Sequence, residues 1–282
     1  MSVRIVVDSA SDLTKERADA LNLDYMPLKT IFGEEEYLDG VTLSHKEFYE
    51  KLIEYGTIPT TSQVSPHDFE TKFKEIKEAG DTAVVICLSS LLSGTYQSAH
   101  IALDGYEDCI TLVDSLNVCL GEQILILYAV QLRDQGFSAE EIAAKLDEKK
   151  QEVCVLAVFD TLEYLKQGGR ISRTAAWAGN VLSIKPVIAI EKGEVVILGK
   201  ARGSKNGNNI LIQEVKNKGG IDFHMPYMLG YSGLDDSLLQ KYIKDSADLW
   251  ADHASTLPIS TIGSTIGTHA GPGAICVSFF HK

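Results

Sequence analysis

Hydrophobic and polar positions alternate along the first half of the chain in a way that predicts strands and helices in regular succession. Short apolar runs at 3–7, 82–88, 109–113 and 153–159 are typical of buried strands. Longer amphipathic segments between them predict helices. The expected helices span residues 14–21, 48–55, 66–79, 96–103, 116–135, 139–149 and 162–167. This order favours a parallel sheet that is covered by helices on both faces.

After about residue 160 the pattern changes. Two apolar runs, 186–190 and 194–198, flank Glu191-Lys192-Gly193, which predicts a hairpin and therefore antiparallel pairing. Helices are expected at 208–216 and 236–251, and strands at 227–231, 258–262 and 274–280. The expected fold class is α/β: a parallel-sheet N-terminal domain over residues 1–155, and a second α+β domain with a mixed sheet over residues 156–282.

The composition is that of a globular protein with a packed core. The chain has 282 residues, of which 45% are hydrophobic and 23% charged. A formal net charge of −13 argues against nucleic acid as the main partner. The chain opens on a strand pattern and contains no apolar stretch long enough to cross a bilayer, so we expect no stable membrane insertion. Five scattered cysteines without a C-x-x-C pair are typical of free thiols in a reducing compartment, and a cytoplasmic location is expected.

Positive charge is concentrated in one stretch of this acidic chain. Residues 166–205 hold eight Lys or Arg and two Glu, a net charge of +6. A solvated surface explains Lys192, Lys200 and Lys205. Arg170 and Arg202 stand next to glycines and are expected on loops, where their guanidinium groups would suit a phosphate.

Two short segments rich in hydroxyl groups carry the candidate chemistry. They are Pro59-Thr60-Thr61-Ser62-Gln63, expected to form a turn, and Leu92-Ser93-Gly94-Thr95-Tyr96, expected to lie between a strand and a helix. The first N–H groups of a helix have no partner within it and favour an anion. Ser93 would add a hydroxyl, and Gly94 would let a ligand approach the backbone. The second segment therefore predicts an uncharged holder for a carboxylate or phosphate.

Cofactor chemistry finds no support in the sequence. Ser93 could act as a nucleophile with His269 as its base, but the G-x-S-x-G elbow is absent, and His269 is expected in a glycine-rich turn. The histidines show no metal spacing, and neither a P-loop nor a G-x-G-x-x-G after a strand occurs. We therefore expect no metal and no cofactor.

Six motifs in order resemble the DegV family of bacterial fatty-acid-binding proteins, over essentially the whole chain. They are Val7-Asp8-Ser9-Ala10-Ser11-Asp12-Leu13, Pro59-Thr60-Thr61-Ser62-Gln63, Leu92-Ser93-Gly94-Thr95-Tyr96-Gln97-Ser98-Ala99, Thr161-Leu162-Glu163-Tyr164-Leu165-Lys166-Gln167-Gly168-Gly169-Arg170-Ile171-Ser172, Ile184-Lys185-Pro186 and His269-Ala270-Gly271-Pro272-Gly273-Ala274. One departure is Val64, which stands where the family often has proline.

The resemblance implies a long-chain fatty acid buried between the two domains. Its carboxylate would be held by Thr61 and Ser93, with Ser62, Gly94 and His269 at the same place. The resemblance also implies a non-catalytic role, in which the protein presents the acid to the separate catalytic subunit of a fatty acid kinase. Residues expected to contact that partner or the phosphate are Arg170, Arg173 and Arg202.

Two alternatives stay open: a serine hydrolase or acyltransferase that uses Ser93 and His269, and a lipid-responsive regulator that acts without a kinase. The lining of the tail cavity is not readable from one sequence. Ordinary core packing is favoured for each of nine candidates: Leu28, Ile31, Phe32, Leu91, Leu92, Phe159, Leu162, Ile188 and Ile266.

Overall fold

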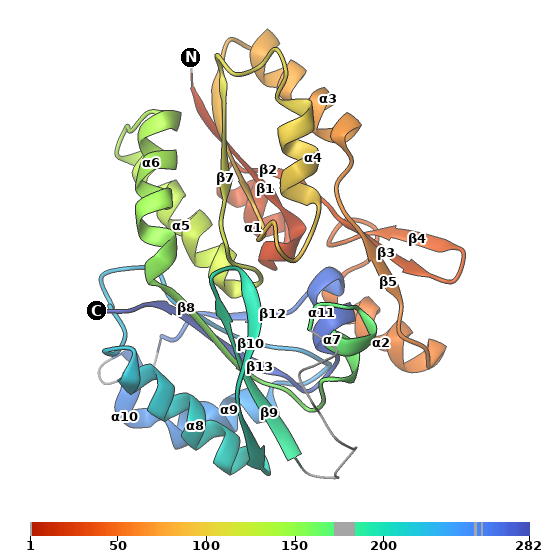
Figure 1. The fold of residues 1–282 in the computed structure, drawn as a ribbon, viewed down its shortest axis with the longest axis vertical. Coiled ribbons are helices and arrows are strands. Elements are labelled where there is room, and N and C mark those ends of the chain that lie inside the picture. Colours follow the sequence, from red (N-terminus) through yellow and green to blue (C-terminus); the bar gives the residue numbers. More distant parts are fainter. Residues whose placement is uncertain (1, 172–183, 251–252, 255) are drawn as a thin grey trace.

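A computed structural model describes residues 2–171, 184–250, 253–254 and 256–282 of the chain, and Figure 1 shows their arrangement. The strands form a parallel four-stranded sheet, a mixed six-stranded sheet and a small antiparallel sheet of three strands. The predicted fold class is confirmed: the parallel sheet lies in the N-terminal half of the chain, and the mixed sheet lies in the C-terminal half.

The parallel sheet has the strand order β2 (Asp24–Met26), β1 (Val3–Asp8), β6 (Thr82–Cys87) and β7 (Ile110–Asp114). One face packs on α3 (Pro66–Glu78) and α4 (Thr95–Ala102). The other face packs on α1 (Lys15–Ala20), α5 (Leu120–Asp134) and α6 (Ala139–Lys149). Two short 3₁₀ turns, η1 (Ser9–Ser11) and η2 (Lys150–Glu152), follow β1 and α6.

The six-stranded sheet has the order β10 (Glu194–Arg202), β9 (Ile184–Glu191), β8 (Val153–Val158), β13 (Ile275–Phe280), β11 (Met228–Tyr231) and β12 (Ile259–Thr261). All neighbours are antiparallel except β11 and β12. One face is covered by α8 (Ser204–Asn217), α9 (Ser237–Asp245) and α10 (Ala247–Trp250). The other face joins the core around α5, so this helix packs between the two large sheets.

The small sheet has the order β4 (Glu35–Leu38), β3 (Lys29–Phe32) and β5 (Thr60–Ser62). It lies beside α2 (His45–Tyr55) and α11 (Ser264–Ala270), and α7 (Glu163–Gln167) packs on α11. Figure 1 shows this group as a side layer next to both large sheets. The sequence pattern did not predict this sheet, because its strands are only three or four residues long.

The structure bears on the expected domain boundary at residue 155 and on the helix expected over residues 236–251. The expected domain boundary after residue 155 falls inside β8, whose six residues all pair with β13. The single helix expected over 236–251 is wrong as stated, because α9 ends at Asp245 and α10 begins at Ala247. Between them the Ser246 hydroxyl donates to the Tyr242 carbonyl and accepts from Trp250 Nε1, which satisfies polar groups at the break.

Candidate functional site: a cavity between the sheets

A cavity of about 350 Å³ lies between the C-terminal end of the parallel sheet, the inner face of the six-stranded sheet and α11. This volume is at the lower end of the range for ligand pockets. Alternate residues of a strand point to one face, and Val155 and Ala157 of β8 and Ile188 and Ile190 of β9 line the cavity in this way. Most of the lining is apolar, and polar side chains gather at one end.

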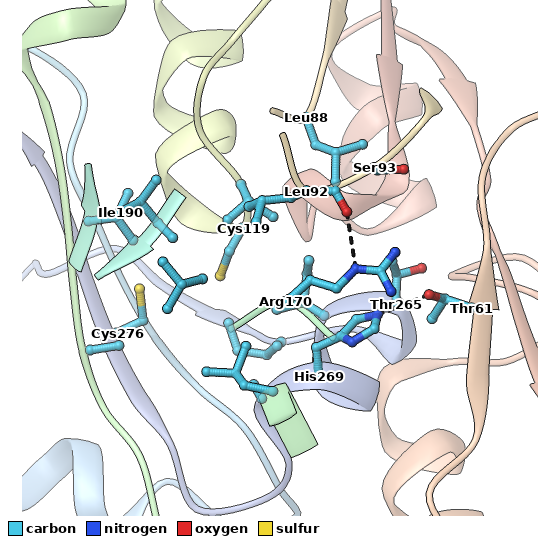
Figure 2. Close-up of a pocket in the computed structure, with 18 of the residues that line it drawn as sticks. Thr61, Leu88, Leu92, Ser93, Cys119, Arg170, Ile190, Thr265, His269 and Cys276 are labelled. Carbon is cyan, nitrogen blue, oxygen red and sulfur yellow. Dashed lines mark hydrogen bonds between the residues drawn. The ribbon is translucent and has the colours of Figure 1, made fainter. Parts of the chain in front are cut away.

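Thr61, Ser93 and His269 lie at this polar end. The Thr61 hydroxyl and His269 Nε2 are hydrogen-bonded at 2.9 Å. Figure 2 shows Thr61, Ser93 and His269 on one side of the cavity, and Ile190 and Cys276 on the opposite side. The structure thus brings together three predicted site residues that are separated by up to 208 residues in the chain.

Thr61 lies on strand β5 rather than in a turn, which corrects the sequence-based expectation. The adjacent β-branched residues Thr60 and Thr61 favour an extended backbone, and Thr61 pairs with Thr30 of β3. Ser62 also lines the cavity and is exposed. Thr61 is the β5 residue whose hydroxyl is hydrogen-bonded to His269.

Ser93 lies just before α4, as expected. Its Oγ accepts from the Thr95 N–H at 3.2 Å and contacts Thr95 Oγ1 at 3.0 Å. Gly94 is the N-cap residue, and a Cβ there would come within 2.8 Å of the Gln63 Cδ. Gln63 in turn donates to Ser98 Oγ at 2.7 Å. This contact links the segment after β5 to α4; Gln63 belongs to the first hydroxyl-rich segment but was not among the predicted site residues.

His269 lies near the end of helix α11, not in a glycine-rich turn, so that expectation is wrong. Gly267 favours a turn in the sequence, but in the structure it lets α11 pack closely against α2. A Cβ at Gly267 would lie 2.7 Å from the Tyr49 hydroxyl. Buried carboxylates hold the start of the helix. Asp39 accepts from the Ser264 and Thr265 N–H groups, and Asp12 accepts from the Gly263 N–H.

Burial, and to a lesser degree the nearby Arg170 guanidinium, lowers the pKa of His269 to about 4. The imidazole is therefore neutral at pH 7. Among the described residues, His269 Nδ1 is buried without a hydrogen-bond partner. At the polar end, Thr61, Ser93 and His269 thus present neutral groups, and the Arg170 guanidinium is the charged group beside them.

Arg170 lines the cavity near His269. Its Nε donates to the Leu92 carbonyl at 3.1 Å, drawn as a dashed line in Figure 2, and Nη1 donates to the Gly168 carbonyl at 2.7 Å. Arg170 also lines a surface groove with Ser90, Ser93 and Gly94. Arg202 ends β10, is exposed and belongs to neither lining. Arg173 lies outside the described residues.

The tail-cavity candidates divide into two groups. Five of them line the cavity: Leu28, Leu92, Phe159, Ile188 and Ile266. Ile31, Phe32, Leu91 and Leu162 are not part of the lining. Thr265, Cys119 and Cys276 also line it and were not singled out from the sequence. Isolated residues in apolar runs give no signal of the face on which they will lie.

The geometry offers little to a Ser93–His269 nucleophile pair. Within the described part of the chain, His269 Nε2 is hydrogen-bonded to Thr61, and Nδ1 faces Gly168. No cluster of three or more potential metal ligands occurs among the described residues. None of the helices in the described segments is long and apolar enough to cross a membrane.

An apolar cavity with one polar end is typical of proteins that bind an amphipathic small molecule. The family model described as "uncharacterised protein, DegV family" matches residues 2–282, and the chain therefore belongs to the DegV family. A DegV domain-containing protein of Caldanaerobacter subterraneus is 36% identical over 99% of each chain.

Solved structures show the same fold. A DegV family protein of Thermus thermophilus, described by its fatty acid binding, has a TM-score of 0.86 and 30% identity over 99% of this chain and 100% of its own. A stearic-acid-binding protein of Eubacterium ventriosum has a TM-score of 0.85 and 28% identity over 100% of this chain and 99% of its own.

Proposed function

We propose that this protein binds a long-chain fatty acid, with the carboxylate at Thr61, Ser93 and His269 and the acyl tail along the inner face of the six-stranded sheet. The observation that carries the proposal is the single polar end of an otherwise apolar cavity. Fatty acid binding by the Thermus thermophilus and Eubacterium ventriosum relatives supports the same ligand class.

The energies assign different tasks to the two parts of the cavity. Burying a tail of about sixteen carbons is worth on the order of 12 kcal/mol before the costs of association, at about 0.8 kcal/mol per CH₂. Each hydrogen bond to a charged carboxylate adds roughly 1.5–3 kcal/mol. The tail therefore dominates affinity, and the hydroxyl groups fix the direction in which the acid enters.

We further propose that the bound acid is presented to the catalytic subunit of a fatty acid kinase, and that the protein itself is not catalytic. Neutral donors leave the carboxylate more nucleophilic than a tight arginine clamp would. The groove that contains Ser93, Gly94 and Arg170 adjoins the polar end, so a phosphoryl donor could approach from there. Arg170, Arg173 and Arg202 are the proposed contacts with this partner or with the phosphate.

Mass spectrometry of the denatured, purified protein tests the ligand class. We expect a fatty acid in the wild type. The double variant Thr61→Val with Ser93→Ala should bind it with an affinity at least about tenfold lower, because two donors to the carboxylate are lost. Thr60→Val is the matched control, since Thr60 is exposed on the other face of β5. Absence of any acyl ligand, or equal affinity in the double variant and the control, would refute the proposal.

The kinase role needs a separate measurement. Charge reversal of Arg202, which lines neither the cavity nor the groove, should reduce formation of the acyl phosphate in the presence of the kinase, while loading of the fatty acid stays close to that of the wild type. Loss of loading with normal docking of the kinase would contradict the assignment of Arg202 to the partner.

A further inference from the structure

At the end of the cavity opposite Thr61, one row of side chains crosses three strands. Val155 of β8 pairs with Ile190 of β9, and Ile190 pairs with Val195 of β10. All three line the cavity. The row lies next to the turn between β9 and β10, and Figure 2 shows Ile190 on the side away from Thr61.

A second pocket of about 320 Å³ lies beyond this row. Its lining combines apolar residues such as Leu116 and Val153 with polar and charged ones such as Lys150. Val155 and Ile190 line both this pocket and the first cavity. Val155 and Ile190 thus form a partition between the two spaces at this point.

Contacts on both sides hold the partition in place. The Ser89 hydroxyl, which belongs to the loop after β6, donates to the Gly193 carbonyl at 2.7 Å and fastens the hairpin turn that follows Ile190. Gly193 has φ +86°, and a Cβ there would lie 2.6 Å from Ser89 Oγ. Behind Val155, Gly121 brings the backbone of α5 so close that a Cβ would overlap the valine side chain.

We infer that Val155 and Ile190 set the longest acyl chain that the protein accepts. The inference rests on the proposed fatty-acid function and deepens it. Because the partition is held from both sides, it keeps a longer tail out of the second pocket. Shortening Ile190 would join the two spaces and let the methyl end of a longer acid enter the second pocket.

The test compares Ile190→Ala with the wild type in competition binding of saturated acids of 14 to 22 carbons. Ile→Ala removes three carbons, and each further buried methylene is worth roughly a fourfold gain in affinity. We therefore expect the preferred length to increase by about two or three carbons. Ile188→Ala is the matched control, because Ile188 lines the same face of β9 but not the second pocket.

Each outcome has one meaning. A shift in Ile190→Ala and none in Ile188→Ala supports the inference. An unchanged length preference in Ile190→Ala, or an equal shift in both variants, overturns the inference. The proposed function still holds in that case if the wild type binds fatty acid. If the wild type binds no fatty acid, the proposed function fails instead. Should Ile190→Ala not fold, Ile190→Val is expected to shift the preference by about one carbon, and no shift would refute the partition.

Discussion

His269 makes the stability of the empty protein sensitive to mild acid. Its pKa is lowered to about 4 in the folded protein by burial and by Arg170, against 6.5 in the unfolded chain. As the pH falls below 6.5, the unfolded chain takes up a proton that the folded protein does not. Folding stability is therefore lost between pH 6.5 and pH 4, and none is lost through this group above pH 7.

The expected loss follows from the two pKa values. At pH 4.5 the unfolded imidazole is almost fully protonated and the folded one is mostly neutral, which corresponds to about 2.5 kcal/mol of unfolding free energy. His269→Gln removes the titrating group and keeps a side chain that can hydrogen-bond to Thr61. The variant should therefore lose less stability than the wild type, by about this amount, when the pH falls from 7.5 to 4.5.

Urea unfolding of delipidated protein at both pH values measures the difference, and other titrating groups cancel between the two proteins. His100→Gln serves as control, because His100 is exposed on α4. An equal loss in wild type and His269→Gln would refute the reasoning. A bound carboxylate would raise the pKa of His269, so added fatty acid should reduce the acid sensitivity of the wild type alone.

Two further substitutions test the core and the site. Burial raises the pKa of Glu122 well above its usual value, and among the described residues neither of its carboxylate oxygens has a hydrogen-bond partner. Because the pKa is raised in the folded protein, stability is lost as the pH rises. Glu122→Gln should therefore stabilise the protein by roughly 1 kcal/mol or more at pH 8 and little at pH 4, whereas Glu148→Gln, at an exposed position, should not. Equal urea midpoints of the wild type and Glu122→Gln at pH 8 would contradict this. A methyl group in Gly168→Ala would overlap His269 Nδ1, so fatty-acid affinity should fall about tenfold or more in calorimetry. Gly199→Ala is the control and should bind fatty acid normally, because its new Cβ would meet Ile210 Cδ1 at an ordinary 3.6 Å. Normal binding by Gly168→Ala would refute the close approach of Gly168 to His269.

The sequence was sufficient for the elements that carry their own signal. Long apolar strands such as β6 and a clearly amphipathic helix such as α3 are fixed by residues within a few positions of one another. The helix start beside Ser93 could be predicted because a strand, a small-residue turn and a helix follow one another directly.

Features that depend on distant contacts could not be read in this way. Strand β5 is three residues long and is defined by its pairing with β3. The glycines around α11 suggest a turn locally, but Gly267 allows the helix to pack against Phe48 and Tyr49 of α2. The partition between the two pockets depends on the register of β8 and β9, which no local pattern encodes.

The cavity exists only in the finished fold, because its walls come from residues as far apart in the chain as Leu28 and Cys276. A molecule that fills it therefore binds the folded chain and not the unfolded one. At a hundredfold excess over its Kd, such a molecule adds about 2.7 kcal/mol to the free energy of unfolding. Protein without a ligand unfolds more often and is more exposed to proteases. The amount of this protein in a cell should thus rise and fall with the supply of the molecule that it holds.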